Sequence, residues 1–156
     1  LALLDGTLYF GGDFSHVSGV ERIMLAAVDA ATGILMAWPN YQGLPPSGFR
    51  AIAAAADKVF VSAHFPTPIE FGRDFVAMHA ETGQVLWMHH LNGLNSPWHV
   101  TEMEASPGLL LVARGGGIAS LNPVDGQIIW SHGTSGWIDA IELVGAAAIV
   151  GGYPGK

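Results

Sequence analysis

The chain has 156 residues, of which half are apolar and 12% are charged, and its formal net charge is −7 at pH 7. This composition suits a folded domain and excludes an intrinsically disordered chain. The sequence contains only six Lys and Arg residues, which argues against a basic surface for nucleic acid or for an anionic membrane.

Cysteine is absent, which excludes disulfides, thiolate metal sites and thiolate nucleophiles. A protein without cysteine fits an oxidising compartment, and it fits the cytosol nearly as well. No apolar run approaches the roughly 20 residues needed to span a bilayer, and the first residues do not resemble a signal peptide. Because Leu1 is not an initiator methionine, we expect an interior piece or a processed product.

Short apolar segments separated by turn signals run along the whole chain, with glycine or proline at many turns. Dipeptides such as Asp5-Gly6 and Pro107-Gly108 between β-formers favour hairpins. We expect a first unit with strands at 1–4, 7–12, 24–30 and 34–38, and a second at 50–56, 59–65, 74–80 and 84–90. A third unit is expected at 99–106, 109–115, 117–121 and 127–132, and a fourth has only 137–144 and 147–153.

Each of the first three units contains a glycine that a tryptophan follows four or five residues later. The pairs are Gly33 and Trp38, Gly83 and Trp87, and Gly126 and Trp130. A hairpin turn at each glycine requires positive φ, which glycine adopts without strain. A polar residue precedes each glycine by four positions and is expected to bond the turn backbone; these residues are Asp29, His79 and Asn122. We expect each tryptophan to cover the neighbouring unit and to find a carbonyl for its indole N–H.

A four-stranded unit that recurs every 40–50 residues or so predicts an all-β fold, a β-propeller of four-stranded antiparallel blades. The single domain would hold about three and a half blades, at about 1–40, 48–92 and 97–133, with a half blade at 136–156. A two-sheet sandwich is the alternative, but it does not predict a Gly-to-Trp motif at a fixed place in each unit. Because a propeller closes only when its last blade meets its first, we expect further sequence or another chain to complete this partial propeller.

The repeats resemble the tryptophan-docking motif of quinoprotein-type, PQQ-like propellers. Ala77, Gly83 and Trp87 match that motif. The departures are His79 in place of Asp, Ser120 and Asn122 before Gly126, and Trp38 displaced by one residue. Residues 7–39 also resemble a secreted bacterial propeller repeat. The resemblances imply an extracellular, cell-surface or periplasmic location, and they specify the fold rather than an activity.

A quinoprotein dehydrogenase is the enzyme hypothesis that the resemblance raises. Those enzymes hold pyrroloquinoline quinone (PQQ) and Ca²⁺ in the central channel, and their vicinal cysteine pair cannot exist here. Calcium takes six to eight oxygen ligands, whereas the acidic residues of this chain are scattered except for Glu102 and Glu104. These two share one face of a strand, and we interpret them as a solvated or channel-lining pair. We therefore expect no cofactor, with PQQ and calcium as the alternative.

Other chemistries have weaker signals. His89 and His90 are adjacent, so on a strand they point to opposite faces and do not form a metal site. Loops that join second to third strands and blade to blade should share one face, at 13–23, 66–73, 91–98 and 133–136. Function in repeat scaffolds usually lies on such loops. The candidate ligand-facing residues are Asp13, His16, Arg22, Arg73, His90, Trp98 and His99.

The sequence therefore favours a non-catalytic propeller module for binding or assembly, part of a larger secreted or surface protein. Its partner would be another protein or the remaining blades of the same protein. Two alternatives stay open: a fragment of a PQQ-dependent oxidoreductase, and a structural subunit of an extracellular assembly whose sheet edges pair with other chains.

Overall fold

The computed structural model describes residues 1–38, 47–66, 71–90, 100–145 and 147–154, and within these ranges the regular structure is all β-strand. The first sheet has the order β1-β2-β5, formed by β1 (Ala2–Leu4), β2 (Thr7–Gly11) and β5 (Leu25–Asp29). Between β2 and β5 the chain forms a separate small hairpin of β3 (His16–Val17) and β4 (Val20–Glu21). No described helix has the length and apolarity to cross a membrane.

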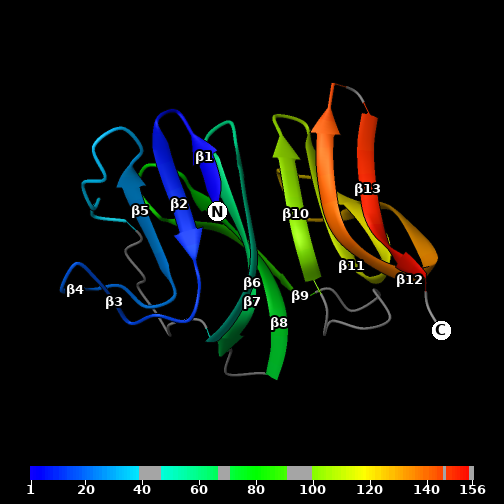
Figure 1. Cartoon of the computed structure of the whole chain (residues 1–156), viewed down its shortest axis with the longest axis horizontal. Helices are drawn as coiled ribbons and strands as arrows, with labels where there is room; N and C mark the ends of the chain where they lie inside the picture. Colours follow the sequence, from blue (N-terminus) through cyan, green and yellow to red (C-terminus); the bar gives the residue numbers. More distant parts are fainter. Residues whose placement is uncertain (39–46, 67–70, 91–99, 146, 155–156) are drawn as a thin grey trace.

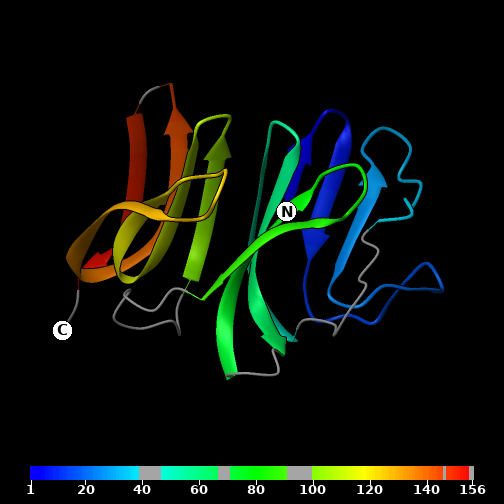
Figure 2. The same cartoon turned by 180° about the vertical axis from the view of Figure 1, so that it is seen from behind.

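Two four-stranded antiparallel sheets follow along the chain. The second sheet has β6 (Ser47–Ala55), β7 (Lys58–Pro66), β8 (Phe71–His79) and β9 (Val85–His90), in that order. The third has β10 (Val100–Ser106), β11 (Leu109–Leu121), β12 (Ile128–Val144) and β13 (Ala147–Pro154). Figures 1 and 2 show the three larger sheets standing side by side along the long axis of the molecule.

The strands differ from the expected ones at three places. Residues 34–38 were expected to form a strand, but this segment contributes only an isolated bridge from Leu35 to Val28. The breaks expected at residue 116 and between 132 and 137 are absent, because β11 and β12 run through them as extended backbone. Figure 2 shows both ribbons turning back near the lower edge of the sheet. Gly116 has φ +85°, so the chain reverses there without leaving the sheet.

Four hairpins repeat with the same register. The residue pair that closes each hairpin turn spans three positions of sequence, and the pairs are Leu4↔Thr7, Ala55↔Lys58, Ser106↔Leu109 and Val144↔Ala147. Three residues before the turn, the inner strand is therefore occupied by Glu104 in one repeat and by Glu142 in the next. The register makes β2, β7, the first half of β11, and β13 equivalent strands.

The core lies between the sheets, and the second sheet is buried on both faces. Val59 and Val61 of β7 pack in the cluster that holds Tyr9, Leu25 and Trp38 of the first unit. Their neighbour Phe60 packs in the other cluster, with Met103, Leu110 and Val112 of the third sheet among its members. Because successive strand residues point to opposite faces, the apolar run in β7 serves both interfaces. Among the described strands, β1 and β13 do not pair, so the sheets are not closed into a ring.

Candidate functional site

Three turns in the chain share one hydrogen-bond pattern. In each, the glycine N–H donates to the carbonyl of the polar residue four positions earlier, at 2.8 to 2.9 Å; the pairs are Gly33 with Asp29, Gly83 with His79, and Gly126 with Asn122. The polar side chain also accepts from turn amides, as Asp29 Oδ1 does from Thr32 N at 2.8 Å. Bonds from Thr32 lower the pKa of Asp29. All three glycines have φ between +70° and +72°.

Two of the three tryptophans bind such a turn in the next sheet. The Trp38 indole is 2% exposed, packs edge-on against Tyr9 at a centroid distance of 4.9 Å, and donates its N–H to the His79 carbonyl at 3.4 Å. The Trp87 indole donates to the Pro123 carbonyl at 3.2 Å. A Cβ added to Gly126 would lie 2.8 Å from the Trp87 ring, so this turn fits against the indole only because residue 126 has no side chain.

Trp130 occupies the same repeat position but is 39% exposed. Its ring contacts His132 at a centroid distance of 5.4 Å. Within the described part of the chain, its indole N–H has no hydrogen-bond acceptor. The tryptophan contact therefore depends on a neighbouring sheet, and Trp130 has none among the described residues.

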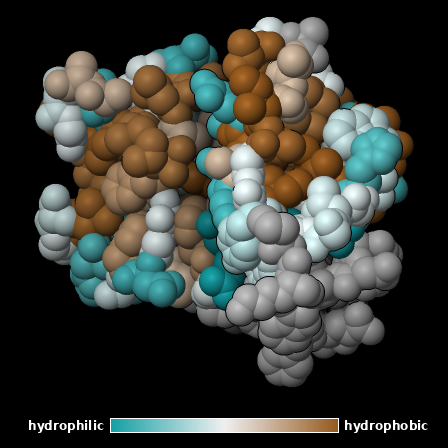
Figure 3. Space-filling view, turned by 45° about the vertical axis from the view of Figure 1, so that its right-hand side comes forward, coloured by the Kyte–Doolittle hydropathy of each residue, from teal (hydrophilic) through white to brown (hydrophobic). Residues whose placement is uncertain are grey.

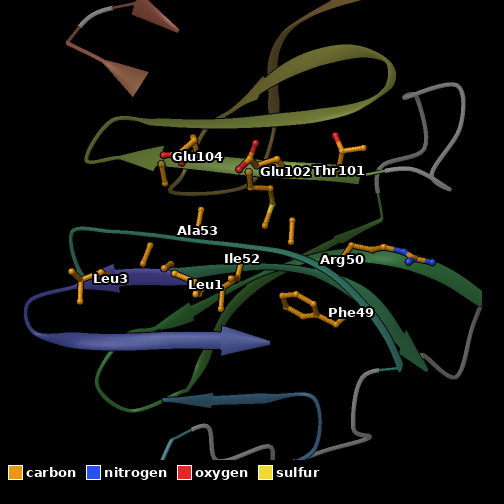
Figure 4. A pocket seen from close by; sticks show the side chains of 14 residues that line it. Leu1, Leu3, Phe49, Arg50, Ile52, Ala53, Thr101, Glu102 and Glu104 are labelled. Atoms are coloured by element: carbon orange, nitrogen blue, oxygen red, sulfur yellow. The ribbon is translucent and has the colours of Figure 1, made fainter. Parts of the chain in front are cut away.

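A groove of about 420 Å³ lies along the inner strands of the three sheets. Its walls come from β1, β6 and β10, and Figure 4 shows β6 between the other two. Leu1, Leu3 and Ile52 supply apolar surface, while Glu102 and Glu104 lie on the β10 side. Figure 4 also shows the Arg50 side chain extending away from these carboxylates. The paired carboxylates expected from the sequence thus line a groove on the inner strands.

Hydrogen bonds already occupy part of this polar wall. Glu102 Oε2 accepts from the backbone N–H of Ile141 at 2.7 Å, and the Thr101 hydroxyl donates to the Ile138 carbonyl at 2.5 Å. Both bonds tie β10 to the inner part of β12. Burial raises the pKa of Glu104, and the charges of Glu102 and Glu142 raise it further. The roles of Thr101 and Glu142 were not expected; the equivalence of Glu104 and Glu142 in the hairpin repeat is the signal that could have found the second.

The ligand-facing residues expected on loops are not brought together by the described structure. Asp13 and His16 are exposed at or near the β3–β4 hairpin, and Ser15 Oγ lies 3.0 Å from His16 Nδ1. Arg22 donates to the carbonyls of Glu21 and Met36 at 2.8 and 2.9 Å, which fixes it to its own unit. The side chains of Arg73 and His90, and the whole of Trp98 and His99, lie outside the described residues.

The described residues do not offer the donor set that Ca²⁺ would need. No three His, Asp or Glu side chains converge in the parts of the chain that the structure describes. In the groove, one Glu102 oxygen is engaged by a backbone amide, and the raised pKa of Glu104 reflects the cost of another charge there. These residues do not fit a quinone–calcium centre, and no chemical step is derived through one.

Comparisons with known proteins identify the architecture. No family model matches the chain, and no curated protein sequence matches it. Among solved structures, the chain is similar to BamB from Moraxella catarrhalis, with a TM-score of 0.60 and 21% identity over 95% of this chain. It is also similar to a europium-containing methanol dehydrogenase, with a TM-score of 0.50 and 17% identity over 72% of this chain.

The chain spans 38% of BamB and 21% of the methanol dehydrogenase. At these identities the likeness shows the fold and not the activity. The propeller predicted from the quinoprotein-like repeats is confirmed, and the two-sheet sandwich is wrong. The division into blades at the expected boundaries stays a prediction. The chain is a partial β-propeller of antiparallel sheets, with its sheets not closed into a ring.

Proposed function

We propose that this chain is a non-catalytic propeller module that binds or assembles with another protein, as part of a larger secreted or surface protein. The observation that carries the proposal is the apolar surface of β12 and β13. Its large exposed side chains, each between 38% and 59% exposed, are Ile128, Ile129, Val144, Ile149, Val150 and Tyr153. Figure 3 shows broad apolar areas on this side of the molecule. Contiguous exposed apolar surface marks interaction sites in folded proteins.

The groove supports a binding module rather than a catalyst. Its best-placed polar groups, Thr101 and Glu102, bond backbone atoms of β12 and hold inner strands together. The repeat tryptophans resemble the tryptophan-docking motif and also hold sheet to sheet, through Trp38 and Trp87. The polar groups that sequence repeats place most regularly are thus used for structure, which leaves surface contacts as the source of function.

Isothermal titration with PQQ and Ca²⁺ separates this proposal from the oxidoreductase alternative. We expect no saturable heat, because the described groove residues do not converge on a metal position. In parallel, sedimentation velocity should show that the chain associates with itself or with a protein partner. Ile149→Lys should weaken that association, because it places a charge in the apolar surface.

Ile34→Lys is the matched control, since Ile34 is 66% exposed but belongs to the first unit. This variant should behave as the unmodified chain in sedimentation. A chain that stays monomeric at all concentrations and binds PQQ with Ca²⁺ would overturn the proposal in favour of the oxidoreductase fragment.

A further inference from the structure

Strand β13 is paired on one side only, whereas its equivalents are paired on both. β2 lies between β1 and β5, and β7 lies between β6 and β8. Among the described strands, β13 pairs with β12 alone and forms the edge of the third sheet. An unpaired edge presents a row of backbone donors and acceptors that another strand can bind.

The repeat register shows what lies against the second edge of an equivalent strand. The first residue of β2, Thr7, faces the turn residue Asp29, and the first residue of β7, Lys58, faces the turn residue His79. The residue equivalent to both in β13 is Ala147. A strand added to β13 in the repeat register therefore places its own polar turn residue opposite Ala147.

The same register pairs a large side chain with a small one. Tyr9 faces Ala27 and Phe60 faces Ala77, and these four residues are at most 5% exposed. Their equivalent in β13, Ile149, is 59% exposed and has no such neighbour among the described strands. An added strand with alanine or another small residue at this place would cover it as the alanines cover Tyr9 and Phe60.

Trp130 provides a second, independent contact for the same segment. Trp38 and Trp87 each donate the indole N–H to a carbonyl in the turn that ends the third strand of the next unit. By this rule, the turn of a hairpin added to β13 meets Trp130. The exposed indole and the unpaired edge thus call for one and the same missing element.

We propose that β13 and Trp130 together form a binding site for a β-hairpin supplied by a protein partner. The hairpin's first strand pairs antiparallel with β13 and carries a small residue opposite Ile149. Its turn resembles those at 29–33, 79–83 and 122–126, with a polar residue first and a glycine of positive φ last. A carbonyl of that turn accepts the Trp130 N–H. This inference deepens the proposed binding function and rests on it.

The test uses the ¹⁵N-labelled chain and a synthetic peptide of its own residues 71–90, which form the β8–β9 hairpin with the required turn. Saturable shifts are expected for the amides of β13 and for the Trp130 indole, with slowed hydrogen exchange along the edge. Shifts confined to the second sheet would mean that the peptide replaces its own segment, and they would overturn the proposal.

Matched variants separate specific docking from general stickiness. A peptide with Gly83→Val cannot adopt the turn, where φ is +70°, and should bind at least about tenfold more weakly. Trp130→Ala in the chain should weaken the normal peptide by a similar factor, while Ile34→Lys should not change its affinity. Equal binding of the two peptides would overturn the proposal.

Sedimentation of the chain without peptide distinguishes a second copy from a different partner. Self-association that Trp130→Ala and Ile149→Lys both abolish would show that another copy can supply the hairpin, which supports the site. Association through β12 and β13 without any peptide binding would refute the hairpin site and leave the proposed binding function standing. Neither association nor peptide binding would refute both.

Discussion

Replacing Trp38 with alanine is expected to destabilise the chain more than the same change at Trp87 or Trp130, although all three hold the same repeat position. The Trp38 indole is 2% exposed and packs against Tyr9. Removing a buried large aromatic side chain typically costs about 3–5 kcal/mol. We expect Trp38→Ala to fall in this range.

The other two positions set the scale. Trp87 is only half-buried but packs on Phe60 and donates to Pro123 O at 3.2 Å, so its loss should lie below that of Trp38. Trp130 is 39% exposed and contacts His132, and surface substitutions of this kind usually stay within about 0.5 kcal/mol.

Trp38→Phe separates packing from the hydrogen bond. The Trp38 N–H to His79 O distance of 3.4 Å is long, and the same carbonyl also accepts from Gly83 N at 2.9 Å. The phenylalanine variant should therefore lose much less stability than the alanine variant. A hydrogen bond typically contributes about 0.5–1.5 kcal/mol, and this one should lie at the low end.

Urea unfolding followed by far-ultraviolet circular dichroism measures these differences, because the midpoint changes at constant slope when stability alone changes. Circular dichroism is preferred because tryptophan fluorescence changes with each substitution. Equal losses for Trp38→Ala and Trp130→Ala would refute the reasoning, since they would mean that contact with a neighbouring sheet does not decide the effect.

Gly126→Ala should cost more stability than Gly33→Ala, because both glycines have φ +72° but only the Cβ at 126 would collide with Trp87; equal urea midpoints would contradict this. Glu104→Gln should stabilise the chain near neutral pH: the raised pKa of this carboxyl means that the folded state binds its proton more tightly, so stability falls as pH rises above the ordinary glutamate pKa of 4.5. Thermal melts across pH should show this gain disappear below that value, and a gain that persists in acid would exclude the electrostatic cause. Tyr9→Phe should cost about 0.5–1.5 kcal/mol, because its hydroxyl donates to the Ala80 carbonyl in the second sheet at 3.1 Å; an unchanged urea midpoint would show that this bond contributes nothing.

Local features of the fold were predictable because they depend on neighbouring residues. The hairpin turns at Asp5-Gly6 and Pro107-Gly108 and the positive φ of the repeat glycines follow from turn chemistry that a few residues determine. The continuous course of β11 was missed because Gly115-Gly116-Gly117 was interpreted as a break between strands. Glycines also let a strand reverse while its neighbours remain in the ladder.

The site was less predictable because its members meet only through register and packing between sheets. Glu102 and Glu104 were singled out, but the bond from Ile141 N to Glu102 depends on how β12 lies beside β10. The difference in burial between Trp38 and Trp130 is equally invisible in their spacing from Gly33 and Gly126. It arises from whether a further sheet covers the indole.

The consecutive order of strands within the second and third sheets has a consequence for folding. Each strand pairs with the next one along the chain, from β6 to β9 and from β10 to β13. Such short-range pairing favours rapid, stepwise formation of hairpins, and each sheet can then add to the one before it as the chain is synthesised. The second sheet is covered on both faces, so the backbone amides of β7 and β8 should exchange with solvent most slowly, while those of β13 exchange first.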